Sequence, residues 1–541
     1  MIDNLYSIHD KNNFYLGLIS QVFKDYSIVQ VENLSWLKFR KLNDELIVSN
    51  TTNIYVVVDA LSGLFLGEIS YSRLPNSDSV HNALIKGDSG KIFPELRIDI
   101  VGYMPKSKSQ FILSGFQNVG LTNPVYLANK EVIDKYLKSV ETSDKEETRL
   151  SPFAKFSNLP SKGLELRPST LFDRHLMCVG MTNSGKSTTA LSILDKLVIS
   201  NKKVLIIDPT GEYEKSFPDS SNVVKLKLGI DTILDSGSLS FSQWATLFET
   251  NDATQPAVLA DAIKSLRYQY SKKINKPYKK EGKTPNDVEK DMASLKTTDR
   301  SFYLNLLPDQ IVEEAVELDN NKNKNYNVYK KGVFQFNQKQ WLVQKVTHKL
   351  SNTRLYEFFL DDTSEKSNLI EKIDEFLSEE IHSLYINTST IGSSESIGGM
   401  IIDLLSSYIL DKKEKNETAF VLFIDEVHRY SRSMKENNYQ IGLSSIAREG
   451  RKKGIFLFLT TQNPQDVPKE LLGQIGTFFI HRLTHTNEIE AIKNHLSEKS
   501  IKLIPNLNRG EAVLTSVNLI QDLYVEIIKS SRNHDNSTPM L

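Results

Sequence analysis

The period of hydrophobic and polar positions changes several times along the chain, and each change predicts a new structural region. Up to about residue 140, short runs rich in Val, Ile and Leu are separated by Gly, Asn, Asp, Ser and Pro. Such runs are typical of strands joined by turns, so residues 1–140 are expected to form a small closed or half-open β-barrel. The expected strands are 17–22, 27–31, 53–58, 64–69 and 96–102. No catalytic group of residues is evident there, which favours a docking or oligomerisation role.

From residue 150 onward, continuous apolar runs alternate with helical patterns. Continuous apolar runs are typical of parallel strands that are buried on both faces. The helical patterns include residues 188–198 and 396–410. The sequence therefore predicts an α/β core in two parts, residues 150–237 and 381–530. Its expected strands are 176–179, 203–208, 384–388, 419–424, 455–460 and 477–483.

Residues 238–380 interrupt this alternation with a different pattern. Helical periodicity is present at 241–248, 256–266, 340–346 and 369–377, which predicts a helical insertion in the core. A polar stretch between these helices carries lysines at 272, 273, 276, 279, 280 and 283. A run of this kind is usually a solvated face, and contact with DNA is the alternative. The composition of residues 531–541 predicts a flexible tail.

Composition and charge set broad limits on the class of protein. The 541 residues, 39% hydrophobic and 25% charged, are ordinary for a soluble protein of several domains. A net charge of -1 argues against a surface that is basic throughout, but it allows a local basic channel. The single cysteine, Cys178, cannot form an internal disulfide, which fits a reducing compartment. No signal peptide is visible and no apolar run approaches the ~20 residues of a membrane span, so a cytoplasmic protein without membrane contact is expected.

The strongest chemical signal is Gly-Met-Thr-Asn-Ser-Gly-Lys-Ser at 180–187, between an expected strand and an expected helix. Its glycines let backbone N–H groups face phosphates, and the helix N-terminus adds a partial positive charge. Lys186 is placed to reach the β- and γ-phosphates, and the Ser187 hydroxyl to complete a Mg²⁺ shell. The predicted phosphate-binding residues are Gly180, Thr182, Asn183, Ser184, Gly185, Lys186, Ser187 and Thr188.

Polar residues end three more of the expected strands. Asp425 and Glu426 follow the apolar run 419–424, so Asp425 is expected to hold the metal and Glu426 to polarise the attacking water. Asp208 and Glu212 follow the run 203–208 and are expected near the nucleotide or its water, with an ordinary turn as the alternative. Gln462, after the run 455–460, is expected to sense the γ-phosphate.

Together these motifs resemble the HerA family of hexameric RecA/FtsK-like ATPases. The resemblance rests on the phosphate loop, Asp-Pro-Thr-Gly-Glu-Tyr at 208–213, Ile-Asp-Glu at 424–426, Arg-Glu-Gly-Arg-Lys-Lys-Gly at 448–454 and Thr-Gln-Asn-Pro at 461–464. It implies a RecA-like P-loop core, ATP hydrolysis between neighbouring subunits of a homo-hexamer, and double-stranded DNA in the central pore. Arg448 or Arg451 would neutralise γ-phosphate charge across the subunit boundary. The chain departs from the family's usual pattern at Asn183, often Gly, and at Thr210, often His.

The resemblance also implies a partner. Family members work with a nuclease of the NurA type, and bacterial relatives pair with sirtuin-like NAD-consuming proteins or other nucleases in antiphage defence. No nuclease or NAD-hydrolysing motif is evident in this chain, so such an activity is expected from the partner. The main hypothesis is a motor that translocates or unwinds duplex DNA. Alternatives are a conjugation or secretion ATPase, and an ATP-binding ring scaffold that activates a partner without processive movement.

Overall fold

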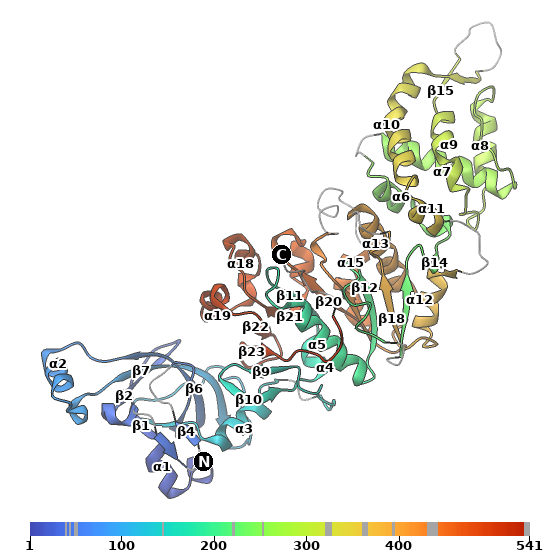
Figure 1. The fold of residues 1–541 in the computed structure, drawn as a ribbon. Helices are drawn as coiled ribbons and strands as arrows, with labels where there is room; N and C mark the ends of the chain where they lie inside the picture. The colour runs from blue at the N-terminus through green and yellow to red at the C-terminus, as the bar shows by residue number, and fades with distance from the viewer. Residues whose placement is uncertain are drawn as a thin grey trace, which may run out of the picture. The chain divides into compact units, whose positions relative to one another are not determined.

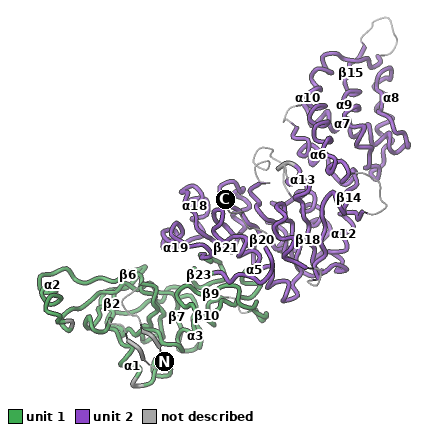
Figure 2. The backbone as a smooth tube through the Cα atoms, in the orientation of Figure 1, with its two compact units in different colours: residues 1–171, 513–526 green, residues 172–512, 527–541 purple. Residues whose placement is uncertain are grey.

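The computed structural model describes residues 1–541 with eleven gaps, namely 38–39, 43–44, 48–51, 143–144, 219–221, 251–253, 320–326, 360–365, 392–394, 430–441 and 535–541. The chain forms two compact units, coloured separately in Figure 2. One contains residues 1–171 and 513–526, and the other contains residues 172–512 and 527–541. The first unit thus extends beyond the predicted limit at residue 140 and takes in a later segment. Among the described residues, no helix combines the length and the apolar character that a membrane crossing requires.

The first unit contains a closed antiparallel barrel in the order β1-β2-β7-β6-β5-β8. Its strands are β1 (Tyr15–Val22), β2 (Ser27–Val31), β5 (Tyr55–Ala60), β6 (Gly63–Arg73), β7 (Glu95–Pro105) and β8 (Pro124–Leu127). β-branched residues fit a pleated surface, and Val56, Val57 and Val58 of β5 are fully buried. Register shifts in β6 and β7 bend these long strands so that the barrel can close. The predicted barrel is therefore confirmed.

Smaller elements complete the first unit. Helices α1 (Ile8–Phe14), α2 (Asp78–Ile85) and α3 (Lys130–Lys138) each begin after a residue whose side chain accepts a hydrogen bond from the first turn. A second group of strands has the order β10-β9-β23-β22. These strands are β9 (Ala154–Phe156), β10 (Leu159–Leu164), β22 (Glu511–Ser516) and β23 (Leu523–Ile527). A separate hairpin, β3 (Arg40–Leu42) and β4 (Glu45–Ile47), lies between β2 and β5 in the chain.

The second unit is built on a parallel sheet in the order β21-β11-β20-β19-β12-β18-β13. Its strands are β11 (His175–Val179), β12 (Lys203–Asp208), β13 (Val223–Lys227), β18 (Ser383–Asn387), β19 (Phe420–Ile424), β20 (Ile455–Thr461) and β21 (Ile475–Ile480). All residues of β11, β12, β18, β19 and β21 are buried, as their continuous apolar sequences predict. Because the strands are parallel, their carboxyl ends meet at one edge. The predicted RecA-like α/β core is confirmed.

Helices flank this sheet (Figure 1). They are α5 (Lys186–Ile199), α13 (Glu395–Lys412), α15 (Gly442–Ser445), α16 (Arg451–Lys453), α17 (Lys469–Leu472), α18 (Thr486–Ile492) and α19 (Glu498–Leu503). A short helix, α4 (Pro168–Phe172), precedes β11 in the chain. A π-helical turn at Ile446–Gly450 separates α15 from α16. A wider turn of this kind is rare and is often found at functional sites.

The chain leaves the sheet between β13 and β18 to form the predicted helical insertion (Figure 1). Its helices are α6 (Phe241–Leu247), α7 (Gln255–Ser271), α8 (Pro285–Ala293), α9 (Leu307–Glu313), α10 (Val333–Leu350), α11 (Thr353–Phe358) and α12 (Leu369–Leu377). Short pairs of strands accompany them, β14 (Thr232–Ile233) with β17 (Ser367–Asn368), and β15 (Val316–Leu318) with β16 (Tyr329–Lys331). Trp244 of α6 is fully buried and packs on Phe248, Phe302 and Phe359. The insertion therefore has an aromatic core of its own.

Part of the lysine-rich stretch between α7 and α8 is engaged inside the insertion. Lys280 forms an ion pair with the buried Glu314, and Lys283 Nζ lies 2.7 Å from Asp291 Oδ2. Lys279 is exposed. The prediction of a solvated face is therefore wrong for Lys280, because the buried carboxylate of Glu314 needs a cationic partner, whereas Lys283 stays partly exposed.

Candidate nucleotide site

The phosphate loop lies between buried strand β11 and helix α5, as the sequence predicts. The backbone is left-handed at Asn183, with φ of 63°, and takes φ of 123° at Gly185, the residue before the helix. A β-carbon on Gly180 would lie 2.6 Å from the β-carbon of His481, so only glycine fits there. Helix α5 is 14 residues long and its N-terminus opens onto the loop. This geometry gathers backbone N–H groups and the helix dipole at one anion-binding point.

Side chains of the loop are tied to neighbouring groups. Lys186 folds back over the loop, with its Nζ donating to the Met181 carbonyl at 3.3 Å. Ser184 Oγ donates to the same carbonyl at 2.7 Å. Thr182 Oγ1 donates to Gln462 Oε1 at 2.6 Å. Ser187 and Thr188 lie on the first turn of α5 and are half-buried. The loop residues are thus brought together with Gln462, which comes from a distant part of the chain.

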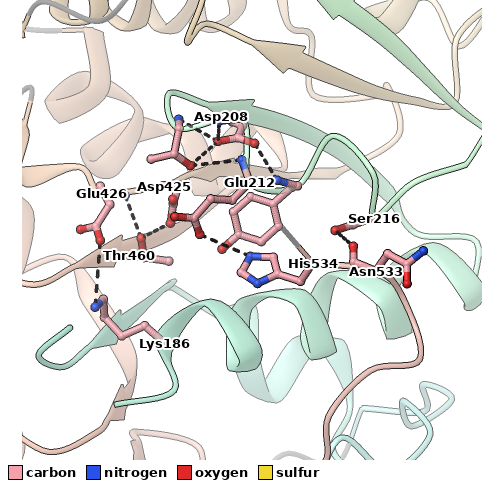
Figure 3. Close-up of polar contacts among 12 residues, drawn as sticks. Lys186, Asp208, Glu212, Ser216, Asp425, Glu426, Thr460, Asn533 and His534 are labelled. Atoms are coloured by element: carbon pink, nitrogen blue, oxygen red, sulfur yellow. Dashed lines mark hydrogen bonds and ion pairs between the residues drawn. The ribbon is translucent and has the colours of Figure 1, made fainter. Parts of the chain in front are cut away.

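Two acidic residues follow β19 at the same edge of the sheet (Figure 3). Thr460 holds both: its Oγ1 donates to Asp425 Oδ1 at 2.6 Å and accepts from the Glu426 backbone N–H at 2.8 Å. Glu426 takes a left-handed backbone, with φ of 47°, which turns its side chain toward the loop. Its Oε1 lies 4.0 Å from Lys186 Nζ and accepts a hydrogen bond from Gln462 Nε2. The carboxylates of the two residues therefore sit in different surroundings.

Those surroundings shift the two pKa values in opposite directions. Burial, followed by the charge of Glu426, raises the pKa of Asp425 to about 8, and Asp208 and Glu212 add to this effect. Burial alone would raise the pKa of Glu426 too, but the nearby His428, the charge of Lys186 and the Gln462 amide hold it below its ordinary value. A carboxylate that stays ionised while buried is suited to accept a proton. The carboxylate of Asp425 is close to other carboxylates, and the described side chains do not balance their negative charge.

Asp208 has a different environment from the one the sequence suggested. Its carboxylate accepts hydrogen bonds from the backbone N–H groups of Thr210, Gly211 and Tyr213, at 2.9, 2.8 and 2.9 Å. The hydroxyls of Thr210 and Tyr385 also donate to it, each at 2.8 Å. With five donors, the carboxylate is occupied in shaping the turn after β12. This geometry favours the alternative of a turn-forming acid, and a direct contact of Asp208 with nucleotide stays a prediction.

Glu212 lies at the end of that turn and is half-buried. Its Oε2 is 3.4 Å from His534 Nε2 (Figure 3). The ring of His534 lies 5.0 Å from that of the fully buried Tyr213. The predicted flexible tail is therefore wrong for residues 531–534, because these residues are held by contacts with the core; residues 535–541 lie outside the described part of the chain.

Two family models match this sequence. The model described as "Helicase HerA, central domain" matches residues 155–396, and "Helicase HerA-like C-terminal" matches residues 404–520. The chain belongs to the HerA family. It is thus a P-loop ATPase of the HerA/FtsK superfamily by descent, and the matched spans include the phosphate loop and the acidic pair described above.

Individual relatives of this HerA family member are distant in sequence. "Probable helicase MJ1565" of Methanocaldococcus jannaschii is 25% identical over 360 residues, which are 65% of this chain and 61% of that protein. "DNA double-strand break repair helicase HerA" of Saccharolobus solfataricus is 23% identical over 401 residues, 71% of this chain and 69% of that protein. The chain thus matches less than two thirds of the first relative's length. Among solved structures, VirB4 of Thermoanaerobacter pseudethanolicus is 14% identical with a TM-score of 0.48, over 72% of this chain and 98% of that one, which is too distant to bear on function.

The two candidate arginines of this HerA family member differ in their contacts. Arg451 Nη2 lies 3.1 Å from Asp173 Oδ1, with 52% of its side chain exposed. Arg448 lies in the π-helical turn and is exposed, and no ion pair joins it to another described residue. Neither arginine contacts the phosphate loop of its own chain within the described residues. Lys453, in contrast, donates to the Leu410 carbonyl at the end of α13.

Three residues of the site escaped the sequence analysis. Thr460 bridges the acidic pair, His428 lies 3.2 Å from Glu426 Oε2, and His481 accepts from or donates to Thr189 at 2.8 Å beneath the loop. His481 Nδ1 faces the Glu511 carbonyl at 2.8 Å, so Nδ1 carries the proton and Nε2 accepts from the threonine. A polar residue at the carboxyl end of a parallel strand was the available signal for Thr460. Nothing local in the sequence marks the two histidines.

Proposed function

We propose that this chain is a ring-forming ATP-driven motor that translocates along or unwinds double-stranded DNA. The observation that carries the proposal is the position of Glu426, held between Gln462 and Lys186 beside the phosphate loop. A base, a phosphate-binding lysine and an amide in contact form the set that phosphoryl transfer to water requires. The family membership supports a motor, and relatives named as DNA repair helicases support duplex DNA as its track.

ATP and Mg²⁺ fit the residues present. Mg²⁺ prefers oxygen ligands and keeps several waters, so it needs one or two protein ligands beside the phosphates. Ser187 at the start of α5 and Asp425 at the end of β19 are the residues that would hold it. The raised pKa of Asp425 is the mark of crowded negative charge, which a divalent cation would relieve. Bound Mg²⁺ would neutralise charge that develops on the phosphates.

The chain's own residues then have distinct tasks. Lys186 and the backbone N–H groups of the loop bind the β- and γ-phosphates, while Glu426 orients a water molecule and takes its proton. Gln462 contacts both Thr182 and Glu426, so a change at the γ-phosphate is transmitted to the loop and the base together. Thr460 is a positioning residue, since it holds the backbone of Glu426 and the carboxylate of Asp425.

A ring supplies the charge that a single chain lacks. The exposed Arg448 would reach the γ-phosphate of a neighbouring subunit, where it would stabilise the transition state as an arginine finger does. Its lack of an ion pair within the described residues supports this role over that of Arg451, which is paired with Asp173. We propose a homo-hexamer, in line with the family to which the chain belongs.

A second protein would complete the pathway. We propose a partner nuclease, NurA-like or of another type, or a sirtuin-like NAD-consuming effector. The motor would feed DNA to this partner in DNA-end processing or antiphage defence. Support comes from relatives named for double-strand break repair and from the lack of a nuclease motif in the sequence.

The test is the dependence of ATP turnover on DNA. A motor that moves along duplex should hydrolyse ATP several-fold faster with linear double-stranded DNA, with little sequence preference and with a steep dependence on salt. A triplex-displacement assay with the same DNA measures movement directly. Turnover that is unchanged by DNA, without displacement, would overturn the motor and favour the ring scaffold that binds ATP to organise its partner.

The same assay locates the DNA contact. The exposed candidates include Lys452 in the basic turn and Lys279, one of the exposed lysines of the insertion. If the turn contacts duplex, Lys452→Glu should abolish the DNA stimulation and leave basal turnover near that of the wild type. If the insertion does, Lys279→Glu should have that effect instead. Lys502→Ala, on the exposed side of α19, is the matched control.

A further inference from the structure

The segment from Lys529 to His534 is fixed against the phosphate-loop helix. Arg532 Nε donates to Asp195 Oδ1 of α5, and Ser530 Oγ donates to Asp195 Oδ2 at 3.0 Å. Only 14% of the Arg532 side chain and 4% of the Asp195 side chain are exposed. A buried pair in which the carboxylate is satisfied on both oxygens is a strong geometric constraint. The segment therefore has a defined position on α5.

A second set of contacts ties the same segment to the turn after β12 (Figure 3). Arg532 Nη1 donates to the Ser216 carbonyl at 3.1 Å, and its guanidinium lies 5.0 Å from the ring centre of the buried Phe217. Ser216 Oγ donates to the Asn533 carbonyl. Arg532 thus joins the helix, the turn and the segment, and its removal would release the segment from both supports.

A cavity of about 600 Å³ lies between this segment and α5. On the helix side it is lined by Gly185, Thr188 and Leu191, and on the other side by Arg509 and residues 529–534. Positions 185, 188, 191 and 195 are spaced by three and four residues, so they lie along one face of the helix. The cavity therefore begins at the phosphate loop and runs along the helix to the Asp195–Arg532 pair.

The direction of the cavity indicates which part of the substrate enters it. The terminal phosphates belong at Lys186 and Ser187, where the acidic pair lies on the other side of the loop. A nucleotide that continues past Thr188 along this face places its sugar and base in the cavity. The volume suits a small ligand. The apolar side chain of Leu191 offers a surface on which a nucleobase can pack, and the polar side chains of Asn533 and His534 offer hydrogen-bonding groups for the edge of the base.

We propose that residues 529–534 form the base-and-ribose wall of the nucleotide site, and that Arg532 is the positioning residue that holds this wall against α5. The proposal rests on the proposed binding of ATP at the phosphate loop. It adds a specific consequence: loss of the wall lowers the affinity for the nucleoside part of the ligand and leaves the affinity for the phosphates unchanged.

The first test compares AMP-PNP with inorganic tripolyphosphate, both with Mg²⁺, by calorimetry on the full chain. Arg532→Ala should weaken AMP-PNP binding about tenfold and change tripolyphosphate binding by less than about twofold, a selectivity that a general loss of folding cannot produce. Lys186→Ala should weaken both ligands, and Lys502→Ala neither. Asp195→Asn should repeat the Arg532→Ala effect, and the double variant should add little, because the two side chains act as one unit.

Several outcomes would overturn the proposal. Unchanged binding of AMP-PNP by Arg532→Ala would show that the segment is not a wall of the site. Equal weakening of both ligands would show that the segment supports the phosphate loop instead. Failure of tripolyphosphate to bind the wild-type chain would instead overturn the nucleotide site itself. An independent arm needs no variant: photolysis of bound 2-azido-ATP should label residues 529–534 or Leu191, and labelling confined to another segment contradicts the assignment.

Discussion

Replacement of Glu426 by glutamine separates nucleotide binding from hydrolysis, because the fold can keep every contact of this side chain except its charge. The glutamine carbonyl can accept from Gln462 Nε2 as Oε1 does now. The amide N–H can donate to His428 Nδ1, which lies 3.2 Å from Oε2. The backbone bond to Thr460 is unaffected. Folding stability should therefore change little.

The expected changes in hydrolysis rate and in ATP affinity follow from two roles of the Glu426 charge, as a general base and as a neighbour of Lys186. Loss of a general base typically slows a reaction by about 10²–10⁴-fold, which corresponds to about 3–5 kcal/mol in the barrier. Lys186 Nζ lies 4.0 Å from Oε1, and two charges at that distance near a protein surface interact by about 4 kcal/mol before the cost of desolvation. Removing the carboxylate charge frees Lys186 for phosphate. Glu426→Gln should therefore bind ATP at least as tightly as the wild type.

Single-turnover hydrolysis of ATP and equilibrium binding of AMP-PNP measure the two effects separately. Lys186→Ala is the comparison that loses binding, and Glu490→Gln, an exposed acid on α18, is the matched control. The reasoning is refuted if Glu426→Gln weakens binding as much as Lys186→Ala does. It is also refuted if hydrolysis stays within about tenfold of the wild type, since another group would then be the base.

Three further predictions concern assembly, pH and the insertion. Arg448→Ala should abolish hydrolysis while ATP still binds, and mixing with Lys186→Ala subunits should restore some turnover; recovery for Arg451→Ala mixtures alone would reverse the assignment. Burial lowers the pKa of His481 from 6.5 to about 4. As the pH is lowered between these values, the unfolded chain takes up the proton before the folded chain does. The free energy of unfolding therefore decreases, by at most about 1.4 kcal/mol per pH unit. Denaturant unfolding should show a shallower fall for His481→Asn, and equal slopes would contradict the buried neutral state. Lys280→Glu should destabilise the insertion by about 3–5 kcal/mol, because it faces the buried Glu314, whereas the exposed Lys279→Glu should leave thermal unfolding unchanged.

The parts of the site that follow from periodicity were predictable from the sequence. Apolar runs fix buried parallel strands, and the carboxyl ends of such strands meet at one edge. The phosphate loop, the acidic pair and Gln462 each end one of these runs, so their meeting requires only the correct sheet. The barrel was predictable for a similar reason, since its strands are short runs rich in β-branched residues between turn formers.

The number of hydrogen-bond and ion-pair partners of each side chain was not predictable from the sequence. Asp208 ends a strand just as Asp425 does, and only the folded turn shows five donors converging on one carboxylate and few on the other. Lys280 and Lys279 are neighbours in one polar run, yet one meets a buried acid from α9 and the other meets solvent. Sequence gives the type of side chain, whereas the number of partners is a property of the tertiary fold.

The contacts of Gln462 join the phosphate loop to Glu426. Its amide oxygen accepts from Thr182 of the phosphate loop, and its amide nitrogen donates to Glu426. An amide can serve both groups at once because it carries an acceptor and a donor on one plane. Movement of the loop therefore changes the position of the base through a single side chain. Helix α5, which follows the loop, has a similar connection further along the chain. There Asp195 and Arg532 connect the helix to residues 529–534. Helix α5 thus contacts Glu426 at its first turn and the proposed nucleoside wall about two turns later. Both ends of a bound nucleotide would therefore contact residues held by the same helix.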